Sequence, residues 1–172
     1  GGTHLARIER WLTTDAAHGM ASVGSPDAAR LRAAAQLVSG LFAAAGAPGD
    51  GPLADRLAQG WGTPRADVLG AALVLCADHE LNVSAFTARC VASADARLEH
   101  VVLAALCAFQ GRRHGGMGVR VAAMLDAAAR GGARAAVDGA FAVQGEAPGF
   151  GHPLYPDGDP RAAELLRIRP AP

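Results

Sequence analysis

Apolar residues recur three or four positions apart along most of the chain, which is the spacing of one face of an α-helix. The segment 98–106 shows the pattern with Leu98, Val101, Val102, Ala105 and Leu106. No segment shows the sustained alternation of a half-buried strand, and about a quarter of the residues are alanine, the best helix former. The pattern predicts an all-α protein with helices over 4–12, 28–45, 53–61, 63–77, 84–93, 95–110, 119–130, 133–143 and 160–168.

Helix caps and breakers set the predicted boundaries. Thr3 can cap the first helix, and Ser25-Pro26-Asp27 places a cap, a first-turn proline and an acid before the second. The centre of the fourth helix, Val68–Leu75, is apolar on all sides and is predicted to lie in the core. A loop as long as Gly145–Asp159 is uncommon in a compact helical domain and is usually functional.

Composition and charge narrow the class of protein. A chain of 172 residues with 51% hydrophobic residues predicts one ordered domain, or a piece of a larger one. Lysine is absent and 16 arginines balance 16 acidic residues, so nucleic acid is not expected as a partner. No segment approaches the roughly 20 apolar residues of a spanning helix, which predicts a soluble, cytoplasmic protein without a membrane partner.

Cysteines and histidines are the remaining candidates for chemistry. Cys76, Cys90 and Cys107 lack a CxxC spacing and are predicted to be buried, reduced thiols. His4, His18 and His100 lie on ordinary helix faces or in loops and are predicted to be solvated.

Three other histidines, His79, His114 and His152, stand where breakers interrupt helices. Neighbouring glycines let backbone approach a ligand, and imidazole can donate to a developing oxyanion or pair with a carboxylate. A zinc site is the competing interpretation, but the three are 35 and 38 residues apart and no HxxxH spacing occurs, so no metal is expected. The common nucleotide-binding and hydrolase motifs are absent.

Four ordered motifs resemble those of the citrate synthases: Asp78–Ser84, Arg113–Gly116, Pro148–Tyr155 and Asp159–Arg161. The resemblance runs from about Val68 to Leu166 and implies a multi-helix citrate synthase-like fold. It divides the chain into N-terminal helices of a large domain (1–51), core helices carrying the first two histidine motifs (52–116), and part of a small domain carrying the GFGH and DPR motifs (117–172).

The resemblance also implies a role for each motif residue in condensing acetyl-CoA with oxaloacetate to citrate and CoA. His114 would hydrogen-bond the thioester oxygen, and His152 would polarise the ketone. His79 and Arg161 would hold oxaloacetate, the arginine by a two-pronged grip on carboxylate. The CoA thioester is a substrate, and no resident cofactor is implied.

Two glycines and a partner copy complete what the resemblance implies. Gly149 and Gly151 would let the loop close over CoA, and a homodimer is expected. The family's catalytic aspartate lies beyond the position of Pro172, so this chain is expected to be a fragment with little activity alone. The acyl donor stays open between acetyl-CoA and propionyl-CoA, the donor of a 2-methylcitrate synthase. There are two further alternatives. One is a shortened noncatalytic homologue that binds acyl-CoA or dicarboxylate, and the other is a helical interaction domain without a ligand.

Overall fold

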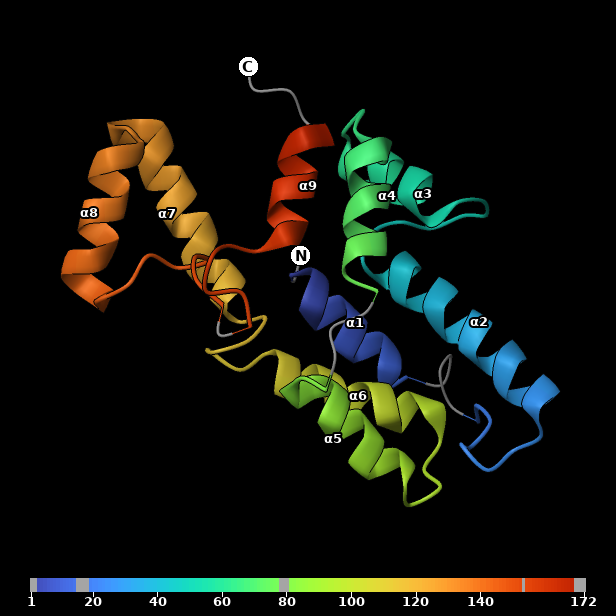
Figure 1. The fold of residues 1–172 in the computed structure, drawn as a ribbon. Coiled ribbons are helices and arrows are strands. Elements are labelled where there is room, and N and C mark those ends of the chain that lie inside the picture. Colours follow the sequence, from blue (N-terminus) through green and yellow to red (C-terminus); the bar gives the residue numbers. More distant parts are fainter. Residues whose placement is uncertain (1–2, 15–18, 78–80, 153, 169–172) are drawn as a thin grey trace. The chain divides into compact units, whose positions relative to one another are not determined.

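The computed structural model describes residues 3–14, 19–77, 81–152 and 154–168. In these segments the secondary structure is helical, apart from two isolated bridges, Ser22–Arg97 and His152–Tyr155 (Figure 1). The all-α prediction is confirmed. The helices are α1 His4–Leu12, α2 Asp27–Ala44, α3 Leu53–Trp61, α4 Ala66–Leu75, α5 Val83–Ala92, α6 Leu98–Phe109, α7 Met117–Gly131, α8 Ala133–Gln144 and α9 Pro160–Ile168. No helix in the described part of the chain is both long and apolar enough to cross a membrane.

Local capping explains several helix starts. The Thr3 hydroxyl accepts from the Ala6 amide and caps α1 as predicted, and the Asn82 side chain caps α5 by accepting from the Ala85 amide. The predicted Ser25 cap of α2 is wrong, because the Ser25 hydroxyl pairs with that of Ser22 and Pro26 occupies the cap position.

α6 begins three residues later than predicted. Asp95, the predicted first residue, has a φ of 55° and its carboxylate accepts from the Gly24 amide. A residue held at positive φ by a contact 71 positions away in sequence cannot start a helix at the same time. The helix therefore begins at Leu98, whose amide donates to the Ala21 carbonyl.

The described chain forms two compact units, residues 1–107 with 161–172, and residues 108–160. The predicted division at 51/52 and 116/117 concerns the domains of a complete family fold and stays a prediction. In the first unit α1 packs on α2 and α3 on α4. Its most buried apolar residues are Leu12, Ala33, Leu37, Ala47, Leu57 and Ala58.

Glycines allow two close approaches in the first unit. A Cβ on Gly40 of α2 would lie 2.0 Å from the Trp11 ring, so the ring of α1 lies directly on the α2 backbone. A Cβ on Gly60 of α3 would lie 1.9 Å from the Gly46 carbonyl oxygen. Because no side chain fits at either position, helix backbone packs directly on its neighbour.

Arg56 of α3 secures the segment between α2 and α3 from inside. Its side chain is buried, and its guanidinium donates twice to the Ala47 carbonyl, at 3.1 and 2.9 Å, and once to that of Ser39 at 3.3 Å. Ala47 is fully buried, so these bonds satisfy a carbonyl that water does not reach.

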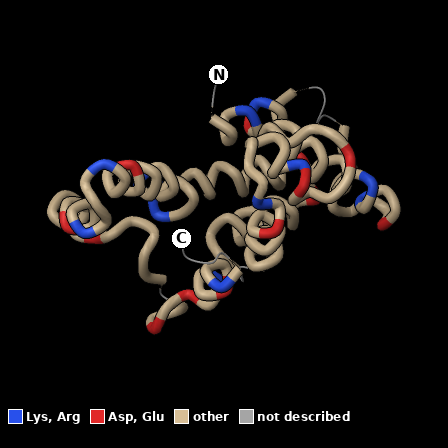
Figure 2. Tube along the Cα trace, turned by 90° about the horizontal axis from the view of Figure 1, so that it is seen from above, with Lys and Arg blue, Asp and Glu red and all other residues tan. Residues whose placement is uncertain are grey.

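Along the described part of the chain, arginine and acidic positions alternate over short stretches of the trace (Figure 2). One of these acidic residues, Glu99 of α6, has a fully buried side chain. Its Oε1 lies 3.0 Å from Nε of Arg97, and neither carboxylate oxygen accepts an aligned hydrogen bond from the described residues.

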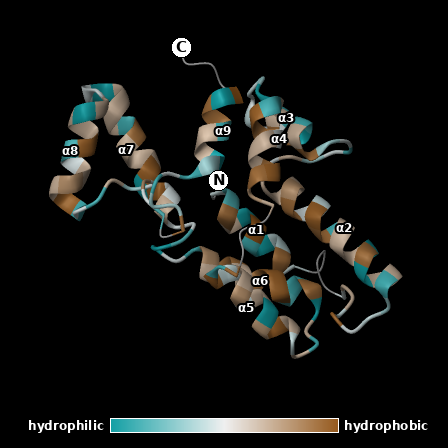
Figure 3. Cartoon of the chain, viewed as in Figure 1, coloured by the Kyte–Doolittle hydropathy of each residue, from teal (hydrophilic) through white to brown (hydrophobic). Residues whose placement is uncertain are grey.

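Two burial predictions are wrong. α4 has no buried residue, and Leu73 and Val74 are exposed, although the helix is among the most apolar of the chain (Figure 3). Within the described residues only the side of α4 toward α3 is covered, so apolar character around the whole helix does not bury it. Cys76, Cys90 and Cys107 are likewise exposed, because each lies on a helix face or end that these residues leave uncovered.

The second unit is built on a helical hairpin. α7 and α8 pack on each other, and Met124, Ala136 and Ala140 form their buried contact with Ala127, Ala128, Val137 and Ala147 at its edge. The small side chains allow the two helices to approach closely. Gly132, with a φ of 87°, reverses the chain between them.

Candidate active site

The turn that presents His114 lies in the second unit and leads into α7. The amides of His114 and Gly116 both donate to the Gly111 carbonyl, at 2.9 and 3.2 Å. The His114 carbonyl accepts from the Met117 amide at 2.9 Å and so leads directly into α7. These bonds fix the backbone of His114 three residues before the first residue of α7.

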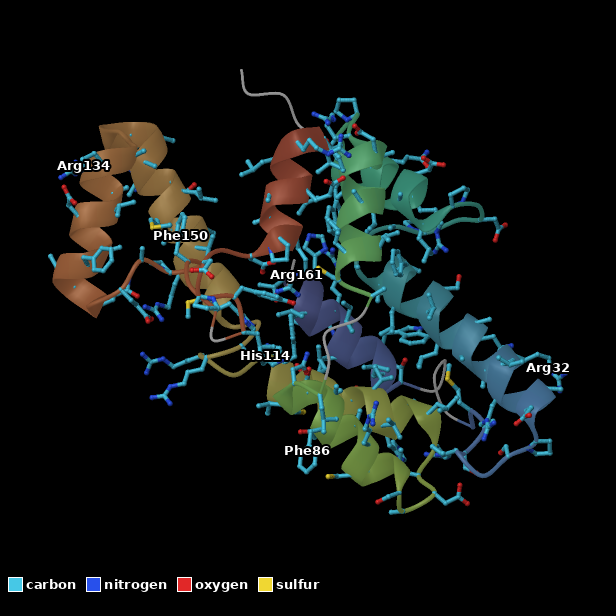
Figure 4. All side chains as sticks on the ribbon, viewed as in Figure 1. Arg32, Phe86, His114, Arg134, Phe150 and Arg161 are labelled. Atoms are coloured by element: carbon cyan, nitrogen blue, oxygen red, sulfur yellow. The ribbon has the colours of Figure 1, made fainter. Side chains whose placement is uncertain are left out.

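Both glycines after His114 are required by packing. A Cβ on Gly115 would lie 2.2 Å from the Phe109 ring, and one on Gly116 would lie 2.5 Å from the Gln110 carbonyl oxygen. The Phe109 ring also meets the His114 ring edge to face, with centroids 4.9 Å apart. Phe109 therefore fills the space that Gly115 leaves and packs against the imidazole, which is half-buried in the turn (Figure 4).

The loop that carries His152 packs on α7, the helix that follows the turn of His114. Gly149 has a φ of 83°, and a Cβ there would lie 2.8 Å from the Val121 side chain of α7. Pro148 before it is fully buried and anchors the loop, while Phe150 is 72% exposed. Gly151, at a φ of 76°, has open space around its Cα, which leaves room for a ligand or for loop movement.

The His152 ring lies at a tight turn. The Leu154 amide donates to its Nδ1 at 3.2 Å, and the Tyr155 amide donates to the His152 carbonyl at 2.9 Å. The imidazole and Tyr155 rings are tilted by 35° with centroids 5.3 Å apart. The ring is therefore held on one edge by backbone and on one face by an aromatic side chain.

A cavity of about 390 Å³ opens beside this turn. It is lined by Gly149, Gly151, His152, Tyr155, Pro156, Asp157, Gly158 and Asp159, all of which belong to the second unit. A volume of this size is sufficient for a small organic acid or one end of a larger ligand. No group of three or more potential metal ligands occurs among the described residues.

The structure brings together four of the six predicted site residues in the second unit: His114, His152, Gly149 and Gly151. Arg161 is half-buried at the start of α9 and belongs to the first unit. His79 lies outside the described residues. The convergence of His79, His152 and Arg161 on one cleft therefore stays a prediction.

The sequence analysis missed three supporting residues: Phe109, Val121 and Tyr155. Phe109 stands five positions before His114, and no local pattern shows that its ring occupies the space that Gly115 leaves. Tyr155 lies within the quoted GFGH segment but was given no role. Val121 carries no local signal, because its partner Gly149 is 28 positions away.

Comparison with known families shows one matching model, described as "Citrate synthase, C-terminal domain", over residues 8–169. A putative citrate synthase 2 of Mycobacterium tuberculosis is 40% identical over 109 residues, which are 62% of this chain and 29% of that protein. Citrate synthase 2 of Bacillus subtilis is 37% identical over 98 residues, 56% of this chain and 26% of that protein.

A 2-methylcitrate synthase of Shewanella oneidensis is 35% identical over 97 residues, again 56% of this chain and 26% of that protein. The chain thus aligns with less than a third of the length of each of these relatives. No solved structure matches the chain.

Proposed function

This chain belongs to the citrate synthase family, and we propose that it supplies the histidine-bearing part of an active site that condenses acetyl-CoA with oxaloacetate to give citrate and CoA. The observation that carries the proposal is the arrangement around α7. The turn of His114 ends where α7 begins, and the loop of His152 rests through Gly149 on Val121, one turn into the same helix. Both motif histidines are thus built on one support.

His114 is proposed to donate to the thioester oxygen of acetyl-CoA. Removing a proton from the thioester methyl places negative charge on that oxygen, and a preplaced donor stabilises this charge as it develops. The packing of Phe109 against the imidazole supports this role, because it fixes the ring before substrate arrives. The base that accepts the methyl proton is assigned to no residue of this chain.

His152 is proposed to donate to the ketone oxygen of oxaloacetate, which makes the ketone carbon more reactive toward the enol carbon. The cavity beside it has room for the ketone-bearing part of such an acid. Arg161 and His79 are proposed to hold the carboxylates. A guanidinium matches a carboxylate with two parallel hydrogen bonds, a geometry that supports the choice of Arg161.

Gly149 and Gly151 are proposed to carry the loop that covers CoA. Both have positive φ values that other residues rarely adopt, and Gly151 has free space around it. CoA enters as the thioester substrate and leaves as product, and the proposal needs no resident cofactor.

We also propose a cytoplasmic homodimer. Val74, Val83 and Phe86 are large apolar side chains with exposed fractions of 74%, 68% and 55%, and burying them against a second copy would remove apolar area from water. Figure 4 shows Phe86 on α5. Analytical ultracentrifugation of the purified chain tests this, and a monomer at all accessible concentrations would contradict it.

The function is tested in the complete gene product by following CoA release from acetyl-CoA with oxaloacetate. His114→Ala and His152→Ala are each expected to lower kcat by about 10²- to 10³-fold, the usual cost of one oxyanion donor. His100→Ala is the matched control, because His100 is an exposed histidine of α6 outside both motifs. Activity of His114→Ala equal to that of the control would refute the proposal.

Parallel measurements separate the alternatives. Propionyl-CoA used in preference to acetyl-CoA would indicate a 2-methylcitrate synthase, and a rise in melting temperature with oxaloacetate without any turnover would indicate a noncatalytic binding protein. Because no described residue is assigned as the general base, and a positioned base contributes roughly 10²- to 10⁴-fold, this chain is proposed to show little turnover by itself.

A further inference from the structure

We propose that the backbone amide of Leu154 fixes the tautomer of His152, so that the neutral ring carries its proton on Nε2. Leu154 is then a positioning residue that acts through its main chain. The proposal deepens the function proposed above, but the tautomer itself can be measured without any substrate.

The tautomer follows from the chemistry of the hydrogen bond. The Leu154 nitrogen lies 3.2 Å from Nδ1 of His152, and a backbone N–H donates but does not accept. Nδ1 must therefore offer its lone pair. A neutral imidazole carries one proton, which is then on Nε2.

The surrounding turn keeps this arrangement in place. The Tyr155 amide returns to the His152 carbonyl at 2.9 Å, and the Gly158 amide donates to the Tyr155 carbonyl at 3.1 Å. The Tyr155 ring lies against the imidazole, so rotation of the His152 ring would separate the two rings and break the bond to Nδ1. Within the described residues, the Leu154 amide is the one group that hydrogen-bonds the ring.

The consequence for ligand choice is that His152 offers a hydrogen-bond donor to the cavity it lines. Asp157 lines the same cavity, and its carboxylate disfavours a second anion beside it. The preferred acceptor is therefore an uncharged carbonyl oxygen, such as that of a ketone. This favours binding of an oxo acid with its ketone toward His152 and its carboxylates elsewhere.

The direct test is NMR of the 172-residue chain labelled with ¹⁵N, recorded at pH 8. Two-bond couplings from the ring carbons' protons to the two nitrogens distinguish the tautomers. We expect His152 to be protonated on Nε2, with a coupling across the hydrogen bond between the Leu154 nitrogen and Nδ1. A proton on Nδ1, or no such coupling, would overturn the proposal whether or not any variant folds.

Two variants give the matched comparison. Leu154→Pro removes the N–H, whereas Leu154→Ala keeps it, and the Leu154 side chain is 56% exposed so that its truncation costs little packing. We expect the proline variant to change the ratio of the two tautomers by about 2- to 10-fold, the size of effect of one hydrogen bond, and the alanine variant to leave it unchanged. Equal ratios in a folded proline variant would overturn the proposal.

Spectra recorded with added oxaloacetate test the role of Leu154 and the proposed ligand separately. If both hold, the ligand shifts the signal of the Nε2 proton. If the tautomer is as expected and oxaloacetate changes no signal at saturating concentration, the positioning by Leu154 stands and the assignment of the ligand fails.

Discussion

Replacing Arg56 by alanine is expected to destabilise the chain much more than replacing an exposed arginine. The side chain is 6% exposed and makes three hydrogen bonds to the carbonyls of Ala47 and Ser39, and its guanidinium carbon lies 5.9 Å from the centre of the Phe42 ring. Truncation leaves the carbonyl of fully buried Ala47 without its donor, which costs about 1–3 kcal/mol, and hydrogen bonds from a charged group contribute about 1.5–3 kcal/mol.

Removing the buried charge offsets part of this loss, because the guanidinium no longer has to be desolvated. We therefore expect Arg56→Ala to lower the free energy of unfolding by about 3 kcal/mol, a fall in Tm of roughly 6–12 °C for a chain of this size. Urea denaturation followed by circular dichroism measures the first quantity, and a thermal scan measures the second.

The matched control is Arg32→Ala, since Arg32 is an exposed arginine of α2 that extends from the helix surface (Figure 4). Its removal should change stability by less than about 0.5 kcal/mol. Arg56→Lys should fall between the two, because an ammonium on a flexible stem lacks the planar fork of the guanidinium. An Arg56→Ala chain as stable as the control would show that the buried hydrogen bonds contribute nothing net, and the reasoning would be wrong.

Three further changes test other contacts. Gly116→Ala should destabilise the chain, because its Cβ would meet backbone at 2.5 Å, whereas Gly118→Ala, with open space around it, should stabilise α7 by about 0.5 kcal/mol; equal melting temperatures would contradict this. Two hydrogen bonds from Arg65 lower the pKa of Asp67 from 3.8 to about 2, so its small contribution to stability is complete above about pH 4 and is lost as the pH falls through about 2; a carboxyl shift in NMR that titrates at 3.8 would contradict the ion pair. Glu99→Gln should lower the free energy of unfolding, because it breaks the ion pair with Arg97 and leaves a fully buried amide without a described partner; an unchanged midpoint in urea denaturation would show that the ion pair contributes nothing net.

Helix positions were predictable because the signals that set them are local. The bounds of α1, α3 and α9 agree with the predicted segments, and each has its start signal directly before or at its first residue. The start of α6 was not predictable in the same way. The local sequence predicts Asp95 as the first residue of this helix. Its carboxylate instead accepts a hydrogen bond from the amide of Gly24, which is far away in sequence.

Burial was predicted less well. Hydropathy identifies the apolar surfaces of a helix, but it does not identify which other segment, if any, packs against them. α4 is apolar on all sides and still exposes Val74. Conversely, Arg56 is strongly polar and buried, because carbonyls from two other segments converge on it. Such convergence depends on tertiary contacts that no local pattern specifies.

In the candidate site, too, some features follow from local sequence and others only from tertiary contacts. The motifs identify His114 and His152 in sequence, and the glycines beside them are explained by close contacts once the structure is known. The partners that orient the rings, Phe109 and Tyr155, become evident only from the distances between ring centroids. Motif spacing thus predicts which groups react, while packing determines how they point.

The order of the two compact units along the chain has a consequence for synthesis on the ribosome. Residues 108–160 form one unit, and they interrupt the other, whose last segment begins at Arg161. The inserted unit consists of neighbouring segments and can fold as soon as α8 and the following loop have emerged. The first unit has to wait for α9, so its early helices leave the ribosome before their final partner exists. During that interval the first unit is incomplete, and its apolar helices are open to chaperones and to aggregation. Slow translation after residue 160 would therefore be expected to reduce the yield of folded protein more than slow translation within the 108–160 segment.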